Sequence, residues 1–371
     1  MLLHDVSFRV DPAADRDVIM RGRMSPGDYA GGNGGAMGVW RTPEAGLDRR
    51  GGTMHIAGNT MTGGFARKWL AVMADRGEDG SMQRAHDSDA GNMVDGALHP
   101  LDAATQLTWT GDGFTGLMTR AYWNFAGPYG GLTAALLMRA LMQHPERRGD
   151  PIALTVNYCA TIAEGPLRIS LRAARTNRST QHWFLELAQG DDAPAITATA
   201  ICSARPETWS HRPAQPPSLP PEAELVRFPW EKSPCAWMSR YDVRLDRYTP
   251  LAPRPLAEPV AGAQTGLMRD EPPRPLDFVS LAAFADCFFA RVFVARGTLM
   301  PVGTISMTTW FHATAEALAR QGEAPLIGHA DTRVYNHGYH DQSAELWSRD
   351  GTLLATSHQL VYFRDPPVHP A

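Results

Sequence analysis

The sequence lacks the features that would place it in a membrane, outside the cell or on nucleic acid. Its 371 residues contain no run of eighteen apolar residues, so no transmembrane helix is predicted. The start, MLLHDVSFRVD, has no apolar core of a signal peptide. The net charge of −4 gives no basic footprint for nucleic acid. We therefore expect a cytoplasmic protein with no membrane span and no nucleic-acid partner.

The sequence also has little that could hold a metal or a cofactor. Its four cysteines show no CxxC spacing and are expected to be reduced core residues. HExxH and HxxxH are absent, and so is the GxSxG elbow of the α/β-hydrolases. The segment Gly111–Gly116 does spell GxGxxG, but β-type residues follow it, which favours a hairpin turn over a dinucleotide site. We expect no metal and no cofactor.

Residues 1–96 differ in composition from the rest of the chain. They contain 17 of the 34 glycines and 9 of the 16 methionines, in runs such as GGNGGAMG. No apolar pattern continues for more than a few residues, so this segment cannot bury enough surface to offset its ordering entropy. We predict a disordered or loosely packed N-terminal extension, and Met93 just before the patterned region leaves open whether residues 1–92 belong to the mature protein.

A first folded unit is predicted over residues 97–205. After the hairpin around Gly111, the segment Gly127–Pro145 opens with glycines, continues with helix formers and ends at proline. Only Thr133 and Arg139 are polar between Leu132 and Met142, which predicts a buried helix. Four strand candidates follow, separated by turn signals: Ile152–Ala160, Leu167–Thr176, Thr180–Gln189 and Ala195–Ala204.

A proline-rich linker, residues 206–236, leads to a second unit, residues 237–366. The segment 205–275 contains 15 of the 29 prolines, a composition typical of extended linkers. The second unit repeats the order of the first, and its strand candidates are Trp237–Arg247, Gln264–Arg269, Val302–Ala313, Leu326–Asn336, Gly338–Ser348 and Thr352–Arg364. Because residues 153–161 occupy the same place in the first unit as 306–314 in the second, we predict an internal duplication.

The helix predicted for the second unit, Asp277–Phe293, carries an unexpected charge. Thirteen of its seventeen residues are apolar and lie on all sides of the helical wheel, so it is expected to be buried. Asp286 lies near its middle, where an unpaired carboxylate would cost several kcal/mol. Asp286 is either a carboxyl bonded to neighbouring backbone or arginine, or the centre of an active site. The fold class is α+β, with two antiparallel sheets that each wrap a long buried helix.

This double-hotdog pattern, over about residues 98–366, resembles the acyl-CoA thioesterase II family. The resemblance lies in Asp286 within SLAAFADCFF, Thr304 within VGTISMTTWFHA and Gln359 within LLATSHQLVYFRD. It implies hydrolysis of acyl-CoA, a lipid-metabolism substrate, to fatty acid and CoA, with these three residues catalytic. The first unit has no such set, since the counterpart of Thr304 falls near Pro151 and that of Gln359 near Ala200 or Cys202. One site per chain is expected, and homo-oligomerisation stays open.

The residue types suit thioester hydrolysis. A carboxylate can accept the proton of an attacking water, while threonine hydroxyl and glutamine amide orient that water. The oxyanion requires donors, which the N-terminal amides of the first helix can supply. Gly130 and Gly131 would permit close approach because they lack a Cβ, and we include Leu132 in this oxyanion and substrate-binding set.

Two other functions remain open at this stage. A hotdog-fold enoyl-CoA hydratase would pair its Asp with a His five residues later, but Arg291 stands there. A non-catalytic acyl-CoA-binding module would need no triad at all. The aromatic residues Trp183, Trp310 and Phe311 suggest apolar walls for an acyl chain whose length the sequence does not show.

Overall fold

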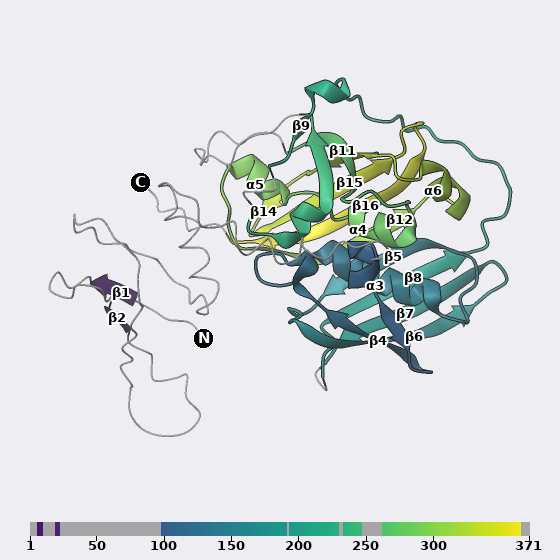
Figure 1. The fold of residues 1–371 in the computed structure, drawn as a ribbon, viewed down its shortest axis with the longest axis horizontal. Helices are drawn as coiled ribbons and strands as arrows, with labels where there is room; N and C mark the ends of the chain where they lie inside the picture. The colour runs from purple at the N-terminus through teal and green to yellow at the C-terminus, as the bar shows by residue number, and fades with distance from the viewer. Residues whose placement is uncertain are drawn as a thin grey trace. The chain divides into compact units, whose positions relative to one another are not determined.

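The computed structural model describes residues 98–190, 193–229, 233–246 and 262–364, together with two short strands near the N-terminus (Figure 1). The chain divides into two units, Met1–Gly91 and Asn92–Ala371. In the first, β1 (Val6–Arg9) pairs with β2 (Ile19–Gly22), two strands that the composition did not predict. The rest of the predicted extension, residues 1–96, lies outside the described residues.

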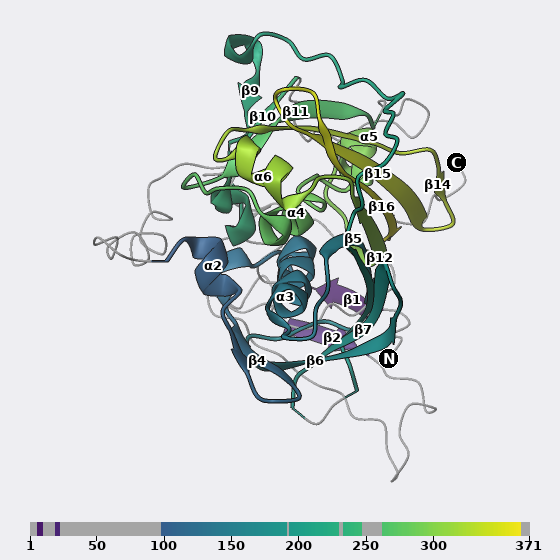
Figure 2. The ribbon, with the colours of Figure 1, turned by 90° about the vertical axis from the view of Figure 1, so that its right-hand side faces the viewer.

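The second unit contains one antiparallel sheet of fourteen strands within the described residues, with the helices on its inner side (Figure 2). Its first half comprises α2 (Pro100–Ala104), β3 (Leu107–Trp109), β4 (Gly113–Met118), α3 (Gly130–Gln143), β5 (Asp150–Tyr158), β6 (Gly165–Thr176), β7 (Thr180–Ala188) and β8 (Ile196–Ser203). Its second half comprises β9 (Val226–Arg227), β10 (Tyr241–Leu245), β11 (Gln264–Asp270), α4 (Phe278–Phe284), α5 (Arg291–Arg296), β12 (Val302–Phe311), α6 (Ala315–Gln321), β13 (Leu326–Asp331), β14 (Tyr335–Asn336), β15 (Tyr339–Trp347) and β16 (Leu353–Phe363).

The strand order of the two halves is the same. It runs β4-β6-β7-β8-β5 in the first half and, from the other edge, β11-β13-β15-β16-β12 in the second. The halves meet where β5 pairs with β12, and there Thr155 and Thr308 lie opposite each other with their hydroxyls 3.0 Å apart. The prediction of two separate sheets is therefore wrong: hydrogen bonds between β5 and β12 join them into one, so neither half has a free edge at this seam.

The two core helices pack against each other on the inner side of the sheet (Figure 2). In α3, ten residues from Gly131 to Leu141 are buried, on every side of the helix, as its composition predicted. The second core helix differs from the prediction: instead of one helix over Asp277–Phe293, α4 ends at Phe284 and α5 begins at Arg291. We call residues 285–290 the α4–α5 loop.

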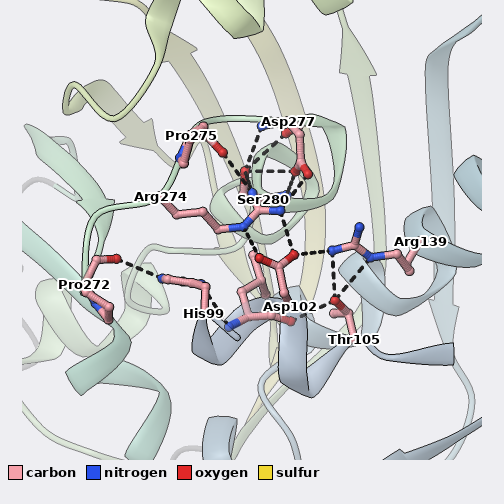
Figure 3. A network of polar contacts seen from close by, with 10 residues as sticks. His99, Asp102, Thr105, Arg139, Pro272, Arg274, Pro275, Asp277 and Ser280 are labelled. Atoms are coloured by element: carbon pink, nitrogen blue, oxygen red, sulfur yellow. Dashed lines mark hydrogen bonds and ion pairs between the residues drawn. The ribbon is translucent and has the colours of Figure 1, made fainter. Parts of the chain in front are cut away.

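An ion network fixes the start of α4 against the first half (Figure 3). The guanidinium of Arg274 donates two hydrogen bonds of 2.8 Å to Asp102, at α2, and one of 2.7 Å to Asp277. Arg139, on α3, also donates to Asp102, at 2.6 Å. Asp277 in turn caps α4 by accepting the backbone N–H of Ser280 at 2.8 Å. The direction in which α4 leads to its loop therefore depends on contacts from both halves.

Candidate active site

Asp286 lies in the α4–α5 loop because a remote side chain and a local one bind backbone carbonyls of that loop. The carbonyl of Ala285 accepts a 3.0 Å hydrogen bond from the hydroxyl of Ser357 on β16. The carbonyl of Phe289 accepts two from the guanidinium of Arg291. These bonds satisfy backbone acceptors that helix ends otherwise leave open. The loop is thus a folded structure, in which Asp286 is half-buried.

The carboxylate of Asp286 faces the first turn of α3. The backbone N–H of Gly131 donates to it, and the side-chain amide of Gln359 donates to its Oδ1 at 2.9 Å. A Cβ on Gly130 would lie only 2.8 Å from Oδ2, so glycine at this position leaves the room that the carboxylate occupies. Residues more than 150 positions apart in the chain therefore meet at one carboxyl group.

Gln359 and Thr304 form a short chain of hydrogen bonds leading to Asp286. The hydroxyl of Thr304 donates to Oε1 of Gln359 at 3.2 Å, which leaves the amide N–H₂ of Gln359 facing Asp286. Gln359 is only 4% exposed, so its orientation depends on these partners. The structure thus brings together the three residues predicted to be catalytic, with Thr304 in contact with Gln359 rather than with Asp286.

A β-bulge in β12 turns Thr304 towards this site. The register of β12 with β16 shifts between Thr304 and Ser306, so Ile305 is an extra residue and is 40% exposed. Since side chains alternate along a strand, the extra residue places Thr304, rather than Ile305, on the inner face with Met307. Bulges are frequent beside active sites, where they re-aim one side chain.

The first half repeats this bulge without the functional side chains. Its register shift lies between Pro151 and Ala153 on β5. Leu154 pairs with Ala200 as Met307 pairs with Gln359, so Ala200 stands where Gln359 stands, and Pro151 where Thr304 stands. This register selects Ala200 over Cys202 as the counterpart of Gln359. Ala200 has no side-chain amide and Pro151 has no hydroxyl, so the first half cannot form the hydrogen bonds that Gln359 and Thr304 form.

Burial raises the pKa of Asp286 to about 7, against the opposing effect of the hydrogen bonds from Gln359 and Gly131. The residue as a whole is half-buried, between the buried residues Ala285 and Cys287. A carboxyl group that is half ionised near neutrality can both accept and return a proton at the pH of the cell. This combination is typical of a general base.

The predicted oxyanion set, Gly130, Gly131 and Leu132, begins α3 next to Asp286. The amide of Gly131 donates to the carboxylate of Asp286, and the amide of Leu132 donates to the carbonyl of Tyr129 at 3.1 Å. A Cβ on Gly131 would lie 2.4 Å from the ring of Tyr129, so glycine is required there for packing. Sequence reasoning missed Tyr129 and also Tyr158, whose hydroxyl donates to the Gly130 carbonyl at 3.0 Å. The tyrosine directly before Gly-Gly was the available signal.

Three further positions were considered from the sequence. Arg291, at the place of a hydratase histidine, is fully buried and donates to the carbonyls of Phe289 and Gly262, so it supports the loop. Trp183 is buried in the first half beside Gln181, and Trp310 is 45% exposed.

The described residues contain no cluster of three or more metal-ligating side chains, and none of their helices is long and apolar enough to span a membrane.

Comparison with known proteins gives the family. Residues 119–203 match the acyl-CoA thioesterase N-terminal domain, and residues 213–363 match the acyl-CoA thioesterase C-terminal domain. No curated protein matches the sequence. Among solved structures, a protein of unknown function with a hotdog fold from Alicyclobacillus acidocaldarius is 44% identical, with a TM-score of 0.68 over 73% of this chain and 100% of its own.

Two more distant structures share the fold. An acyl-CoA thioesterase II from Mycobacterium marinum is 17% identical, with a TM-score of 0.56 over 72% of this chain and 100% of its own. A TesB protein from Mycobacterium avium subsp. paratuberculosis is 18% identical, with a TM-score of 0.56 over 72% and 98%. With both thioesterase domains matched in order and the hotdog fold shared, the chain belongs to the acyl-CoA thioesterase II family and is a thioester hydrolase.

Proposed function

We propose that the protein hydrolyses acyl-CoA to a free carboxylic acid and CoA at a single site centred on Asp286. Each half of the sheet with its core helix is then one hotdog, and the second half supplies the catalytic side chains. The observation that carries the proposal is the carboxyl of Asp286, held by Gln359 at 2.9 Å against the N-terminus of the first unit's helix α3.

In the proposed reaction, ionised Asp286 accepts a proton from a water molecule while the water oxygen attacks the thioester carbon. The carbon–sulfur bond of the tetrahedral intermediate then breaks, and the proton on Asp286 passes to the leaving thiolate. The amide N–H₂ of Gln359 donates to the carboxylate of Asp286 and orients it. The hydroxyl of Thr304 donates to Oε1 of Gln359 and so fixes the amide. No covalent intermediate is required, which agrees with a site built around a carboxyl, a hydroxyl and an amide.

The oxyanion is assigned to the first turn of α3. Amides at a helix N-terminus carry partial positive charge and point away from the helix, so they can stabilise developing negative charge. Because the amides of Gly131 and Leu132 have acceptors within the protein, the Gly130 amide is the member of the predicted set that we assign to the substrate. Its lack of a Cβ lets the carboxylate of Asp286 lie directly against this helical turn, so base and oxyanion donor are adjacent.

Release of free thiol from acyl-CoA tests this function directly. The purified full-length chain is expected to liberate CoA thiol from at least one ester in a panel from acetyl-CoA to palmitoyl-CoA. An enoyl-CoA hydratase would leave the thioester intact and hydrate the double bond of an enoyl-CoA. An acyl-CoA-binding module would retain the ester and release nothing. The absence of thiol release across the panel would therefore reject the proposal.

The rate of hydrolysis is expected to rise with pH up to about 7 and then level off. Asp286 must be ionised to accept a proton, and its raised pKa of about 7 leaves only about a tenth of it ionised one pH unit lower. Gln359→Leu removes a donor that holds this pKa down, so the midpoint should move upwards. A pH profile of kcat/KM for the wild type and for Gln359→Leu measures the midpoint and its shift. A wild-type profile that is flat across this range would contradict the assignment of Asp286 as the base.

Gly130→Ala is expected to lower kcat/KM by about 10- to 100-fold with little loss of stability. The new Cβ would lie 2.8 Å from Oδ2 of Asp286 and 3.4 Å from the hydroxyl of Tyr158, so the carboxylate must move. Alanine itself is well tolerated in a first helical turn. The matched control is Gly303→Ala on β12, whose Cβ would meet no atom within 4 Å. Equal activity of the two variants would show that close approach at Gly130 is unimportant.

A further inference from the structure

A small apolar cavity lies beside the loop that carries Asp286. Its volume is about 20 Å³, and its walls come from the α4–α5 loop, from the neighbouring strands β10, β11 and β13, and from Trp237 and Phe228. Cys287, the residue after Asp286, lies in its wall, followed by Phe288 and Phe289. In the α4–α5 loop, Asp286 therefore belongs to the candidate active site, and the next three residues line an apolar cavity.

Two glycines form one wall of the cavity. Gly266 on β11 and Gly328 on β13 are paired directly across the sheet, and both lie against the cavity. A Cβ on Gly328 would lie 3.0 Å from Cζ of Phe288 and 2.4 Å from Cε of Met268. Two adjacent positions without side chains leave a depression in the sheet. The tip of the Phe288 ring and the end of the Met268 side chain both lie against Gly328.

Aromatic rings enclose the cavity on its other sides. The rings of Phe228 and Phe289 are 4.7 Å apart, and Trp237 stacks on Tyr129 at 4.4 Å. The hydroxyl of Tyr129 donates to the carbonyl of Ala283 at the end of α4, at 2.7 Å. Trp237 thus connects the cavity wall with the residue that precedes the predicted oxyanion turn. Cys287, next to Asp286, and Trp237, stacked on Tyr129, are therefore the two wall residues that adjoin the site.

The volume of the cavity sets a limit on its occupant. About 20 Å³ is little more than the space for one water-sized group. A chain of many methylene groups would have to displace the Phe288 ring or leave its tail outside. The walls contain mostly hydrocarbon and aromatic surface, which excludes a charged acyl group.

We propose that this cavity receives the acyl group and that Phe288, whose ring tip lies against Gly328 in the cavity wall, restricts the enzyme to short, uncharged acyl-CoA esters. The proposal rests on the proposed function, since it names the substrate class of the same site. It replaces the expectation for the acyl walls drawn from the sequence, because Trp183 and Trp310 lie elsewhere and Phe311 packs on Phe278.

The test compares chain-length profiles rather than absolute rates. For the wild-type chain, kcat/KM for butyryl-CoA should exceed that for palmitoyl-CoA by at least about 100-fold, because one unaccommodated methylene already costs about 10-fold or more. Phe288→Ala removes the ring and should lower this ratio by at least about 10-fold. Phe288→Leu should give an intermediate ratio. Because both esters are measured on the same sample, the ratio does not depend on the fraction of the protein that is folded.

Phe311→Ala is the matched control. It removes an equally large ring from the core of the second half, where Phe311 is 2% exposed and outside the cavity wall. Its ratio should equal that of the wild type. A wild type that hydrolyses both esters equally well, or a ratio that Phe288→Ala leaves unchanged, would overturn the proposal while the thioesterase function stands. A wild type that hydrolyses neither ester nor any other would overturn both.

Discussion

Asp286→Asn is expected to lower turnover by at least about 10²-fold, because the amide keeps the size of the carboxyl but cannot accept the proton of the attacking water. The site can adapt to the new side chain. Gln359 can turn its amide over so that Oε1 accepts from the introduced amide and its own N–H₂ group donates to the hydroxyl of Thr304, which donates to Oε1 in the wild type. The loss should therefore be a loss of chemistry.

The same substitution is expected to stabilise the folded protein above neutral pH. Burial raises the pKa of Asp286 to about 7, from 3.8 for a free aspartate, so the folded state favours the protonated form. The wild type thus loses stability as pH rises from about 4 to about 7, while the variant has no such group to ionise. The gain should be absent at pH 4 and reach between about 1 and 4 kcal/mol above pH 7.

Urea unfolding at several pH values, together with thiol release at saturating acyl-CoA, measures both effects. Asp112→Asn is the control, since Asp112 is exposed in the β3–β4 turn and should change neither quantity. A variant that is inactive and also less stable at pH 8 would show that the amide disrupts the loop. A variant that is active and folded would exclude Asp286 as the base.

The strands and the first core helix could be predicted because their patterns are local. Alternating apolar residues predict β6 and β7 to within two or three residues, and the all-round apolar run predicts α3 as a buried helix. The short helix Pro100–Ala104 was not predicted, since five residues are too few to show a helical period. Local periodicity thus gives most elements, and with the repeated order it gives the duplication.

The break between α4 and α5 could not be predicted from local sequence. Residues 285–290 contain neither glycine nor proline, and alanine and phenylalanine both continue helices well enough. The break depends on Ser357 and Gln359 on β16, which donate to the carbonyl of Ala285, and on Arg291. The two bonds from β16 are tertiary, and they override helix propensity at the position where Asp286 must leave a regular helix.

The residues identified by the family resemblance lie close together in the structure, whereas those assigned from residue type alone do not. Asp286, Gln359 and Thr304 do lie in one chain of hydrogen bonds, and their catalytic roles remain to be tested. Trp310, suggested as an acyl wall from its aromatic character alone, is 45% exposed, and that suggestion stays untested. Trp310 lies on the outer face because side chains alternate along β12 and its neighbours Thr309 and Phe311 are buried.

Arg274→Met is expected to destabilise the protein by about 2–3 kcal/mol at neutral pH, the largest stability loss that we predict for a residue outside the site. The Arg274 side chain is 9% exposed, and its guanidinium donates to Asp102, to Asp277 and to the carbonyl of Pro275 (Figure 3). Removing it leaves carboxylates without their main partner, which costs about 3–5 kcal/mol for fully buried pairs. We discount this figure because the side chains of Asp102 and Asp277 are 29% and 41% exposed.

The pH dependence of this loss identifies its origin. Hydrogen bonds from Arg274 lower the pKa of Asp102, and they keep that of Asp277 below its usual value against the opposing effect of burial. These carboxyls stabilise the folded wild type when ionised, and that contribution disappears as pH falls through their lowered pKa values. The difference between wild type and variant should therefore be largest near neutrality and shrink below about pH 4. A difference independent of pH would attribute the loss to packing instead.

Arg120→Met makes the same change at an exposed ion pair and serves as the control. Arg120 and Glu164 are 2.6 Å apart, but their side chains are 59% and 50% exposed, so water screens the pair and the loss should stay below about 1 kcal/mol. For a body of this size, the loss at Arg274 corresponds to a fall in Tm of about 5–10 °C. Because the network fixes the start of α4, residual folded Arg274→Met should also lose activity, through displacement of Asp286 from Gly131. Full specific activity in the folded fraction would show that the α4–α5 loop is positioned by β16 and Arg291 alone.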